Sequence, residues 1–248
     1  MNQIIEALLD HRSIRKFKDK KLTEEQIHTI VKAAQQASTS SNVMAYTIIG
    51  VKDEHLKEEL YNVSGHQHVK DNAHMFIFCG DLHRINHLDN PEHNQHIQEN
   101  LESTEQLIVA TVDAALAAQN ASIAAESMGL GICYIGSLRN DINRVNELLE
   151  LPEYVIPLFG LVVGYPDHMP DIKPRLPLET IYHEDKYKPF AKQQKFIEAY
   201  DNEMSNYYKT RSSNTKADTW SDQMVRKFSN PTRMDVTPFI KSKNLNKR

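Results

Sequence analysis

The chain has 248 residues, a formal net charge of −4, 40% hydrophobic residues and 25% charged residues. These values are ordinary for a soluble globular protein, and they allow a sizeable hydrophobic core. The length suits one large domain, or one domain with an extension.

Targeting and membrane signals are not evident. The start MNQIIEALLD carries acids and no basic region of the kind that opens a signal peptide. The longest apolar stretch, VIPLFGLVVGY, is shorter than the ~20 residues that span a bilayer and contains a proline. Cys79 and Cys133 lie in apolar strand-like runs without a CxxC motif, so buried inert thiols are expected. A cytoplasmic protein without a membrane partner is predicted.

Charge is distributed unevenly along the chain. Residues 1–185 hold 15 Lys/Arg and 27 Asp/Glu, whereas residues 186–248 hold 14 and 6. We therefore predict a core at 1–185 and a basic extension at 186–248. Such an extension could bind nucleic acid, an acidic partner subunit or an anionic small molecule, but it lacks the signature of a known nucleic-acid module.

The first half of the chain predicts alternating helices and strands. IIEALLD (4–10) is typical of a short amphipathic helix, and the capping box TEEQ starts a second helix at Thr23. Apolar residues at helical spacing follow it as far as Ala34. Strands are expected at 46–51 and 75–81, with a helix at 53–63 between them that Asp53 caps.

The second half is dominated by a long helix, expected at 101–128. Residues 107–125 are apolar on almost every side, which indicates a buried helix that could pack against its copy in a dimer. Strands at 132–136 and 155–164 flank a helix at 141–151, and two more helices are expected at 196–208 and 218–228. This alternation indicates an α/β or α+β layered fold.

Several common catalytic motifs do not apply. The GxG of GLGICYIG follows a helix and precedes a strand, the reverse of a dinucleotide-binding fingerprint, so Gly129 and Gly131 are interpreted as helix C-cap glycines. None of the close histidine pairs, 66/68, 83/87 and 93/96, lies in a known metal-binding motif. We therefore predict that these histidines lie at the surface and that the protein has no metal site. No P-loop or GxSxG nucleophile elbow is found.

Two short basic segments carry the strongest functional signal. HRSIRKF (11–17) and KPRLP (173–177) combine guanidinium, ammonium, imidazole and hydroxyl groups. Those groups together recognise phosphate, so the two segments could form a two-part anion clamp. The alternative is that each is a solvated basic loop.

These segments occur in order with ASTSSN, GHQHV, DAALAAQNASIAAESMGLGICYIGSLRN, PLFGLVVGYP and DTWSDQ. The whole chain thereby resembles the flavin-dependent nitroreductase superfamily, most closely the NADPH-dependent oxidoreductases of the nitroreductase A and flavin reductase P type. The resemblance implies an α+β three-layer sandwich: a mostly antiparallel central sheet, helices on both faces and a long buried central helix. It also implies an intertwined homodimer that binds FMN at its interface, in which the C-terminal extension wraps the partner.

The resemblance also assigns residues to the cofactors. His11 and Ser13 are expected at the FMN phosphate with Lys173 and Arg175, and Arg12 is expected beside the ribityl chain. Arg15 is expected at the N1/C2=O edge of the flavin ring and Gln67 at its pyrimidine edge. The run Tyr134, Ile135, Gly136 and Ser137 passes the ring and offers a backbone N–H to N5. Thr39 and Ser40 stand in the family's serine loop. The basic extension offers Arg211, Lys216 and Arg233 as candidates for the NADPH phosphate, and the resemblance favours Arg211 and Arg233. The alternative is that these are solvated charges or dimer contacts.

The implied reaction is a ping-pong, two-electron transfer from NADPH through FMN to a nitroaromatic, a quinone or free flavin. FMN carries this chemistry, so no side-chain acid or base is required. Three alternatives stay open. They are a flavin reductase that supplies reduced FMN to a partner monooxygenase, a flavin-binding protein without catalytic activity, and a nucleic-acid binder that uses the basic extension.

Overall fold

The computed structural model describes residues 2–212 and 214–248. The chain forms two compact units: the first runs to Met169 and includes Arg233–Arg248, and the second is Pro170–Thr232. The boundary expected from charge, between residues 185 and 186, falls inside the second unit. The chain changes unit in the Pro-rich run after Gly164, where charge composition gives no signal.

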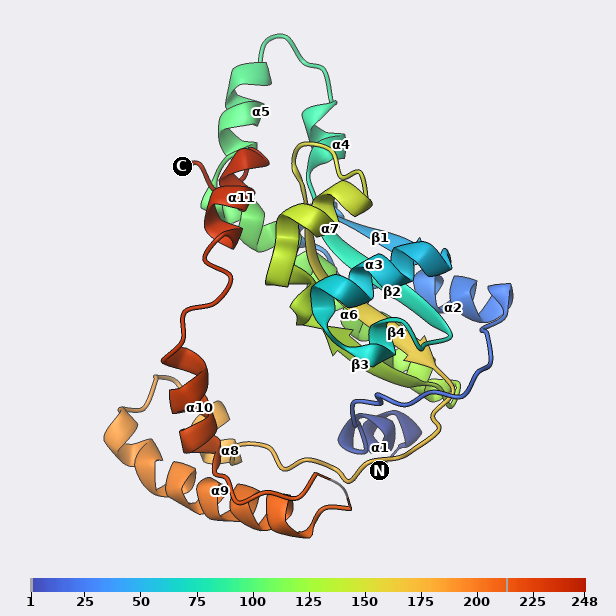
Figure 1. Ribbon diagram of the computed structural model, residues 1–248. Coiled ribbons are helices and arrows are strands. Elements are labelled where there is room, and N and C mark those ends of the chain that lie inside the picture. Colours follow the sequence, from blue (N-terminus) through green and yellow to red (C-terminus); the bar gives the residue numbers. More distant parts are fainter. Residues whose placement is uncertain (1, 213) are drawn as a thin grey trace. The chain divides into compact units, whose positions relative to one another are not determined.

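A four-stranded antiparallel sheet forms the centre of the first unit (Figure 1). Its strands are β1 (Tyr46–Val51), β2 (His74–Asp81), β3 (Gly131–Ile135) and β4 (Val155–Gly164), in the order β1-β2-β4-β3. Every residue of β2 is buried, as expected for a strand covered on both faces. The α+β class is confirmed.

Helices α2 (Glu24–Gln35) and α6 (Thr104–Ser127) cover one face of this sheet. The alanines of α6 pack against Phe76, Phe78 and Leu161, because a small side chain lets a helix approach a sheet closely. The predicted long central helix is therefore confirmed, although it begins later than expected. Ser103 caps it by accepting a hydrogen bond from the Gln106 backbone N–H, which separates it from the preceding helix.

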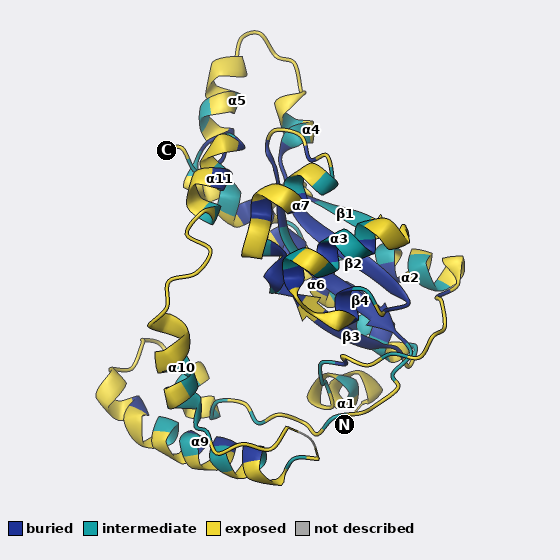
Figure 2. Ribbon diagram, in the orientation of Figure 1, coloured by how far each residue is buried: buried dark blue, intermediate teal, exposed yellow. Residues whose placement is uncertain are grey.

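The opposite side of α6 is exposed. Ile108, Val112 and Leu116 are 52%, 46% and 42% exposed (Figure 2). The apolar pattern predicted a helix buried on every side, and within one chain this prediction was wrong for the side that carries these residues. Within residues 2–212 and 214–248, α6 is the one helix whose length and composition would also suit a membrane span. The packing of its other side against the sheet is that of a core helix.

Helices α3 (Glu54–Ser64) and α7 (Ile142–Leu148) cover the second face of the sheet. Leu60 and Val145 from these helices pack on Met75, Ile77 and Val162 of the strands. Both predicted helices and the three-layer arrangement are therefore confirmed. Two short 3₁₀ turns, Gln67–Val69 and Gly136–Asp141, lie at the ends of this layer.

The remaining elements of the first unit are short, and the second unit contains one long helix. The first unit adds α1 (Gln3–Leu9), α4 (His83–Asn86), α5 (Asn94–Leu101), α11 (Val236–Ser242) and a 3₁₀ turn at Ser40–Asn42. The second contains α8 (Leu178–Ile181), α9 (Phe190–Thr210) and α10 (Trp220–Phe228). Helix α9 starts well before the expected residue 196, because its first turns lack the apolar face that periodicity detects.

Burial changes the chemistry of several side chains. Both cysteines are buried as predicted, and burial raises the pKa of Cys79 to about 12. His68 was expected at the surface but is 8% exposed, because its turn folds under α3. Burial lowers its pKa to about 4, and it does the same for His74, whose Nε2 is buried without a partner among the described residues.

These two histidines predict loss of stability in acid. Their pKa values lie near 4 in the folded state and near 6.5 in the unfolded chain, so the unfolded chain binds more protons between these values. Their contribution is complete above pH 6.5 and is lost as the pH falls towards 4. Lowering the pH from 7 to 5 should therefore reduce the free energy of unfolding by roughly 2 kcal/mol for each histidine. Urea denaturation at the two pH values measures this difference.

The matched variants are His74→Gln and His55→Gln. His74→Gln removes one titrating group, so it should flatten the pH dependence, whereas replacing the exposed His55 should not. Equal slopes in wild type and His74→Gln would contradict the assignment.

Candidate functional site

The segment HRSIRKF lies alongside β3, the edge strand of the sheet. Ser13 forms a parallel bridge with Ile132, and the Ile14 N–H donates to the Ile132 carbonyl at 2.8 Å. Further on, Phe17 forms an antiparallel bridge with Pro166. These contacts fix the backbone of the segment to the sheet. The segment is therefore not a free solvated loop, which was the alternative interpretation.

Two glycines make this close approach possible. A Cβ at Gly131 would lie 2.5 Å from Ile14 Cγ1, and a Cβ at Gly164 would lie 2.8 Å from Phe17 Cδ1. The interpretation of Gly131 as a helix cap was therefore wrong: it is the first residue of β3 and makes room for Ile14. Gly129 has a φ of +73°, as a position near a helix C-terminus requires.

Side chains of an extended segment alternate between its two sides. Arg15 and Ser13 lie close enough to Cys133 to lower its pKa, although burial raises that pKa more. Arg15 also acts on His68, whose pKa is lowered by burial, by His66 and by Arg15. Arg15 therefore lies near both β3 and the turn that contains Gln67.

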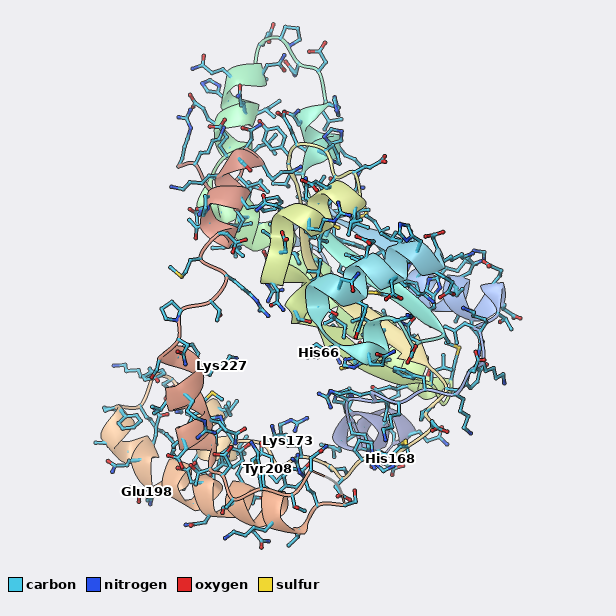
Figure 3. All side chains as sticks on the ribbon, viewed as in Figure 1. His66, His168, Lys173, Glu198, Tyr208 and Lys227 are labelled. Atoms are coloured by element: carbon cyan, nitrogen blue, oxygen red, sulfur yellow. The ribbon has the colours of Figure 1, made fainter. Side chains whose placement is uncertain are left out.

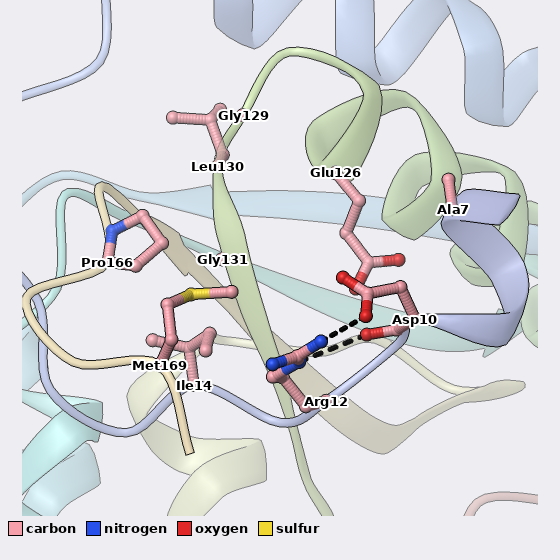
Figure 4. A pocket seen from close by; sticks show the side chains of 10 residues that line it. All are labelled: Ala7, Asp10, Arg12, Ile14, Glu126, Gly129, Leu130, Gly131, Pro166 and Met169. Carbon is pink, nitrogen blue, oxygen red and sulfur yellow. Dashed lines mark hydrogen bonds and ion pairs between the residues drawn. The ribbon is translucent and has the colours of Figure 1, made fainter. Parts of the chain in front are cut away.

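Arg12 belongs to a different environment. A cavity of about 200 Å³ is lined by Arg12, Ile14, Glu126 and seven other residues, and Arg12 forms an ion pair with Asp10 at its edge (Figure 4). His11 Nδ1 lies 2.6 Å from Glu126 Oε1 at the C-terminal end of α6. The structure thus separates the environment of Arg12 from that of Arg15.

The turn that contains Gln67 is a compact polar structure. The Gln67 side-chain amide donates to Asp71 at 2.8 Å, and the rings of His66 and His68 stack with centroids 5.3 Å apart. His66 is labelled in Figure 3. Together with Arg15, this turn gives one side of the site both hydrogen-bonding groups and a permanent charge.

The residues at the end of β3 offer backbone groups and one buried hydroxyl to a ligand. Pairing with β4 runs to Ile135, opposite Gly160, and Gly136 then begins a 3₁₀ turn. The Tyr134 hydroxyl lies 2.8 Å from Ser122 Oγ, so its ring is held against α6. The Ser137 Oγ is buried without a hydrogen-bond partner in the described part of the chain. An orphaned buried hydroxyl is expensive, which favours a ligand at this turn.

Thr39 and Ser40 lie elsewhere in the first unit. The Ser40 and Ala45 backbone N–H groups donate to the fully buried Asp113 carboxylate, both at 3.0 Å. Asp113 and Glu126 are 13 positions apart on α6, which is about 20 Å at 1.5 Å per residue. One chain therefore does not bring the serine loop to His11.

The basic candidates divide between the units. Lys173, Arg175, Arg211 and Lys216 belong to the second unit. Arg233 belongs to the first, where its guanidinium donates to Asn140 Oδ1 at 2.9 and 3.1 Å, four residues after Gly136. Arg233 thus joins the turn at the end of β3.

Sequence reasoning missed two acidic residues that organise the site. Asp113 is the only charged residue between 107 and 125, and a single carboxylate in an apolar helix is a recognisable signal for a buried anchor. Glu126 lies among polar residues at the end of the same helix, where nothing in the sequence marks it as the partner of His11.

The nitroreductase family model matches residues 8–165, and the model of the nitroreductase family C-terminal domain matches residues 173–248. The chain therefore belongs to the nitroreductase family.

Individual relatives agree over the full length. The chain is 49% identical to the FMN reductase (NADPH) of Bacillus subtilis (strain 168), covering all of both proteins. It resembles the solved structure of the NfrA1 nitroreductase from B. subtilis with a TM-score of 0.94 and 48% identity, covering 99% of this chain and 100% of that one. The NADPH:FMN oxidoreductase from Vibrio harveyi complexed with NAD⁺ gives 0.87 and 38%, covering 100% of both.

Gly131→Ala tests the docking of residues 13–17. The new Cβ would overlap Ile14, so we expect a destabilisation of about 1–3 kcal/mol and faster amide hydrogen exchange at Ile14. Urea denaturation and exchange measured by mass spectrometry provide the two readouts.

The matched control is the double variant Gly131→Ala/Ile14→Gly, which also removes the Ile14 Cβ that would lie 2.7 Å from the new methyl group. It should be less destabilised than the sum of the two single changes. Strict additivity would show that the two residues do not meet.

Proposed function

We propose that this protein is an FMN-dependent NADPH oxidoreductase that reduces nitroaromatics, quinones or free flavin by two-electron transfer. The observation that carries the proposal is the fixed strand that brings Ser13 and Arg15 to Cys133 and His68. The full-length similarity to an FMN reductase (NADPH) supports the same function.

The residues of the first unit fit a flavin. The buried hydroxyl of Ser137 lacks a partner among the described residues, and it follows a glycine backbone that can approach a flat ring. Gln67 offers an amide, and Arg15 offers a planar cation. Glu126 contacts His11 at Nδ1, so Nε2 is the ring nitrogen that would meet a ligand. His11, Arg12, Ser13, Arg15 and Gln67, together with the run Tyr134–Ser137, are the residues that would hold FMN here.

When bound, FMN supplies the hydride transfer between NADPH and the acceptor. Arg15 is charged at every working pH, so it stabilises negative charge at the flavin edge without a proton transfer. The Gly136 backbone N–H is the donor that would hold the flavin at this turn. Arg233 lies next to this turn and is a candidate for the NADPH phosphate. Within the second unit, the candidate phosphate-binding cations are Lys173, Arg175, Arg211 and Lys216.

A homodimer is part of the proposal. The exposed apolar side of α6 contains Ile108, Val112 and Leu116, and a second copy would bury it. Asp113 on the same helix holds the serine loop about 20 Å from Glu126. Thr39 and Ser40 therefore serve the flavin of the partner copy. The free, buried thiols agree with a reducing, cytoplasmic setting.

A second candidate function is the delivery of reduced FMN to a separate monooxygenase. It is favoured by the name FMN reductase (NADPH) of the B. subtilis relative. Slow exchange of bound FMN with free FMN would exclude this role, whereas exchange faster than turnover would favour it.

The purified protein should be yellow and should release about one FMN per chain on denaturation. It should oxidise NADPH when a quinone or nitroaromatic is added under anaerobic conditions. Absorbance near 450 nm measures the bound flavin, and absorbance at 340 nm follows the oxidation of NADPH. A colourless protein that does not take up FMN would contradict the proposal.

Arg15→Ala should make the flavin harder to reduce. Removing the cation should lower the midpoint potential and slow reduction by NADPH at least about tenfold, because ~1.4 kcal/mol corresponds to a factor of ten. Stopped-flow absorbance and a redox titration measure the two effects. Lys16→Ala is the matched control, since the neighbouring cation points to the other side of the strand. Unchanged kinetics in Arg15→Ala would remove its proposed role.

A further inference from the structure

Two imidazole rings meet at α4, outside the candidate cofactor residues. The Nε2 atoms of His83 and His87 lie 3.0 Å apart, and the ring centroids lie 4.3 Å apart with an interplanar angle of 84°. The sequence predicted surface histidines and no metal site here. The structure changes that interpretation, because it brings the two Nε2 atoms together at the surface.

A backbone carbonyl fixes the tautomer of His83. Its Nδ1 lies 3.0 Å from the Glu153 carbonyl oxygen, which can only accept, so in the neutral ring Nδ1 carries the proton and Nε2 keeps a lone pair. Histidines that bind metals are held in this way, with one ring nitrogen on a carbonyl and the other on the ion. Without an ion, His87 Nε2–H donates to this lone pair. When an ion binds both Nε2 atoms, the His87 proton moves to Nδ1.

Contacts with the sheet hold α4 in place. The His83 N–H donates to Asp81 Oδ1 at 2.9 Å. The Arg84 guanidinium donates to the Tyr46 carbonyl at 2.7 Å and to the Met44 carbonyl at 3.0 Å. The pair is therefore prepared for a ligand, and little conformational entropy would be lost on binding.

The distance between the two nitrogens favours one class of ion. Imidazole nitrogens bind first-row divalent ions at about 2.0–2.1 Å, so a separation of 3.0 Å gives a nitrogen–metal–nitrogen angle of roughly 94°. A tetrahedral zinc site would need the nitrogens about 3.3 Å apart. An angle near 90° is that of the square-planar or tetragonal sites of Ni²⁺ and Cu²⁺.

The surroundings suit a hydrated cation. Within residues 2–212 and 214–248, no third His, Cys, Asp or Glu joins the pair, so the other coordination positions are left to water. A cavity of about 300 Å³ beside His87 is lined mostly by polar side chains that can hold such waters, namely Asn86, Asp89, Asn94 and Gln98. Residues 81–102 hold five carboxylates and one arginine, and this excess of negative charge attracts a cation.

The pair lies at the opposite end of the sheet from residues 13–17. Helix α4 follows the end of β2 that pairs with Val155, the first residue of β4 (Figure 1). Residues 13–17 lie against Gly131, which pairs with Gly164 at the other end of β4. Because β4 has 10 residues, about 3.3 Å per step separates these ends by roughly 30 Å. An ion held by the pair would therefore act on the fold and not on residues 13–17.

We propose that His83 and His87 form a structural binding site for a divalent ion of the Ni²⁺ and Cu²⁺ class. The ion would join the first residue of α4 to its C-cap, and the bond from His83 to Glu153 would extend this tie to the turn before β4. The proposal goes beyond the proposed function and does not depend on it, because the site shares no residue with the candidate cofactor site.

The test is a calorimetric titration of the full-length protein, without a polyhistidine tag, with a Ni²⁺ salt. We expect about one Ni²⁺ per chain. His87→Gln and His83→Gln should each weaken binding at least about tenfold, since even the partners behind a metal ligand contribute that much. The matched control is His93→Gln, which removes an exposed imidazole at the N-cap of α5 and should leave Ni²⁺ affinity unchanged. Urea denaturation without metal checks that the variants fold.

Amide hydrogen exchange locates the bound ion. The His87 and Leu88 N–H groups close the last turn of α4, where they donate to the Arg84 and Ile85 carbonyls at 3.3 and 3.0 Å. Saturating Ni²⁺ should slow exchange of these two amides in the wild type, because the ion ties the turn together. It should not slow their exchange in His87→Gln.

Four results would overturn the proposal. Absence of Ni²⁺ binding would exclude the site. Equal affinity in wild type and His87→Gln, or equal losses in all three variants, would identify an adventitious ion only. Tighter binding of Zn²⁺ than of Ni²⁺ would contradict the right-angle geometry. Unchanged exchange in α4 at saturating Ni²⁺ would show that the ion binds elsewhere.

Discussion

The contact between Ile14 and Gly131 is the constraint on which the site depends. Because Gly131 has no side chain, the extended segment at residues 13–17 lies directly on β3. Its backbone hydrogen bonds fix the register of every residue from Ser13 to Phe17. The register of this segment on β3 determines which of its cationic side chains lie on the same side. A shift by one residue would exchange Arg15 with the side chains that face the opposite side.

The sequence predicted the layers well because they depend on local periodicity. The capping box at Thr23, the alternation in the strands and the apolar length of α6 each follow a short-range rule. What it missed depends on contacts between distant segments. The role of Gly131 requires Ile14, more than a hundred residues earlier, and the burial of His68 requires the helix above it. Both residues have ordinary neighbours in the sequence.

Cofactor residues illustrate the same limit. Composition marked HRSIRKF and KPRLP as candidate anion-binding segments, but it could not separate Arg12 from Arg15. The structure does so through Asp10, which pairs with Arg12, and through Cys133 and His68, which lie near Arg15. Asp113 was detectable in principle, as the one charge in an apolar helix, yet its two N–H partners lie in a loop about 70 residues away.

The return of the chain to the first unit has a consequence for its integrity. The last residues are firmly held: the Tyr154 N–H donates to the Lys243 carbonyl, the buried Lys243 ammonium donates to the Leu151 carbonyl at 2.7 Å, and Leu245 is 1% exposed. Pro170–Thr232 is therefore an excursion anchored at both ends. A protease that cuts once within it would leave two fragments that stay associated, so a nicked molecule would keep its mass in solution and reveal the break only after denaturation.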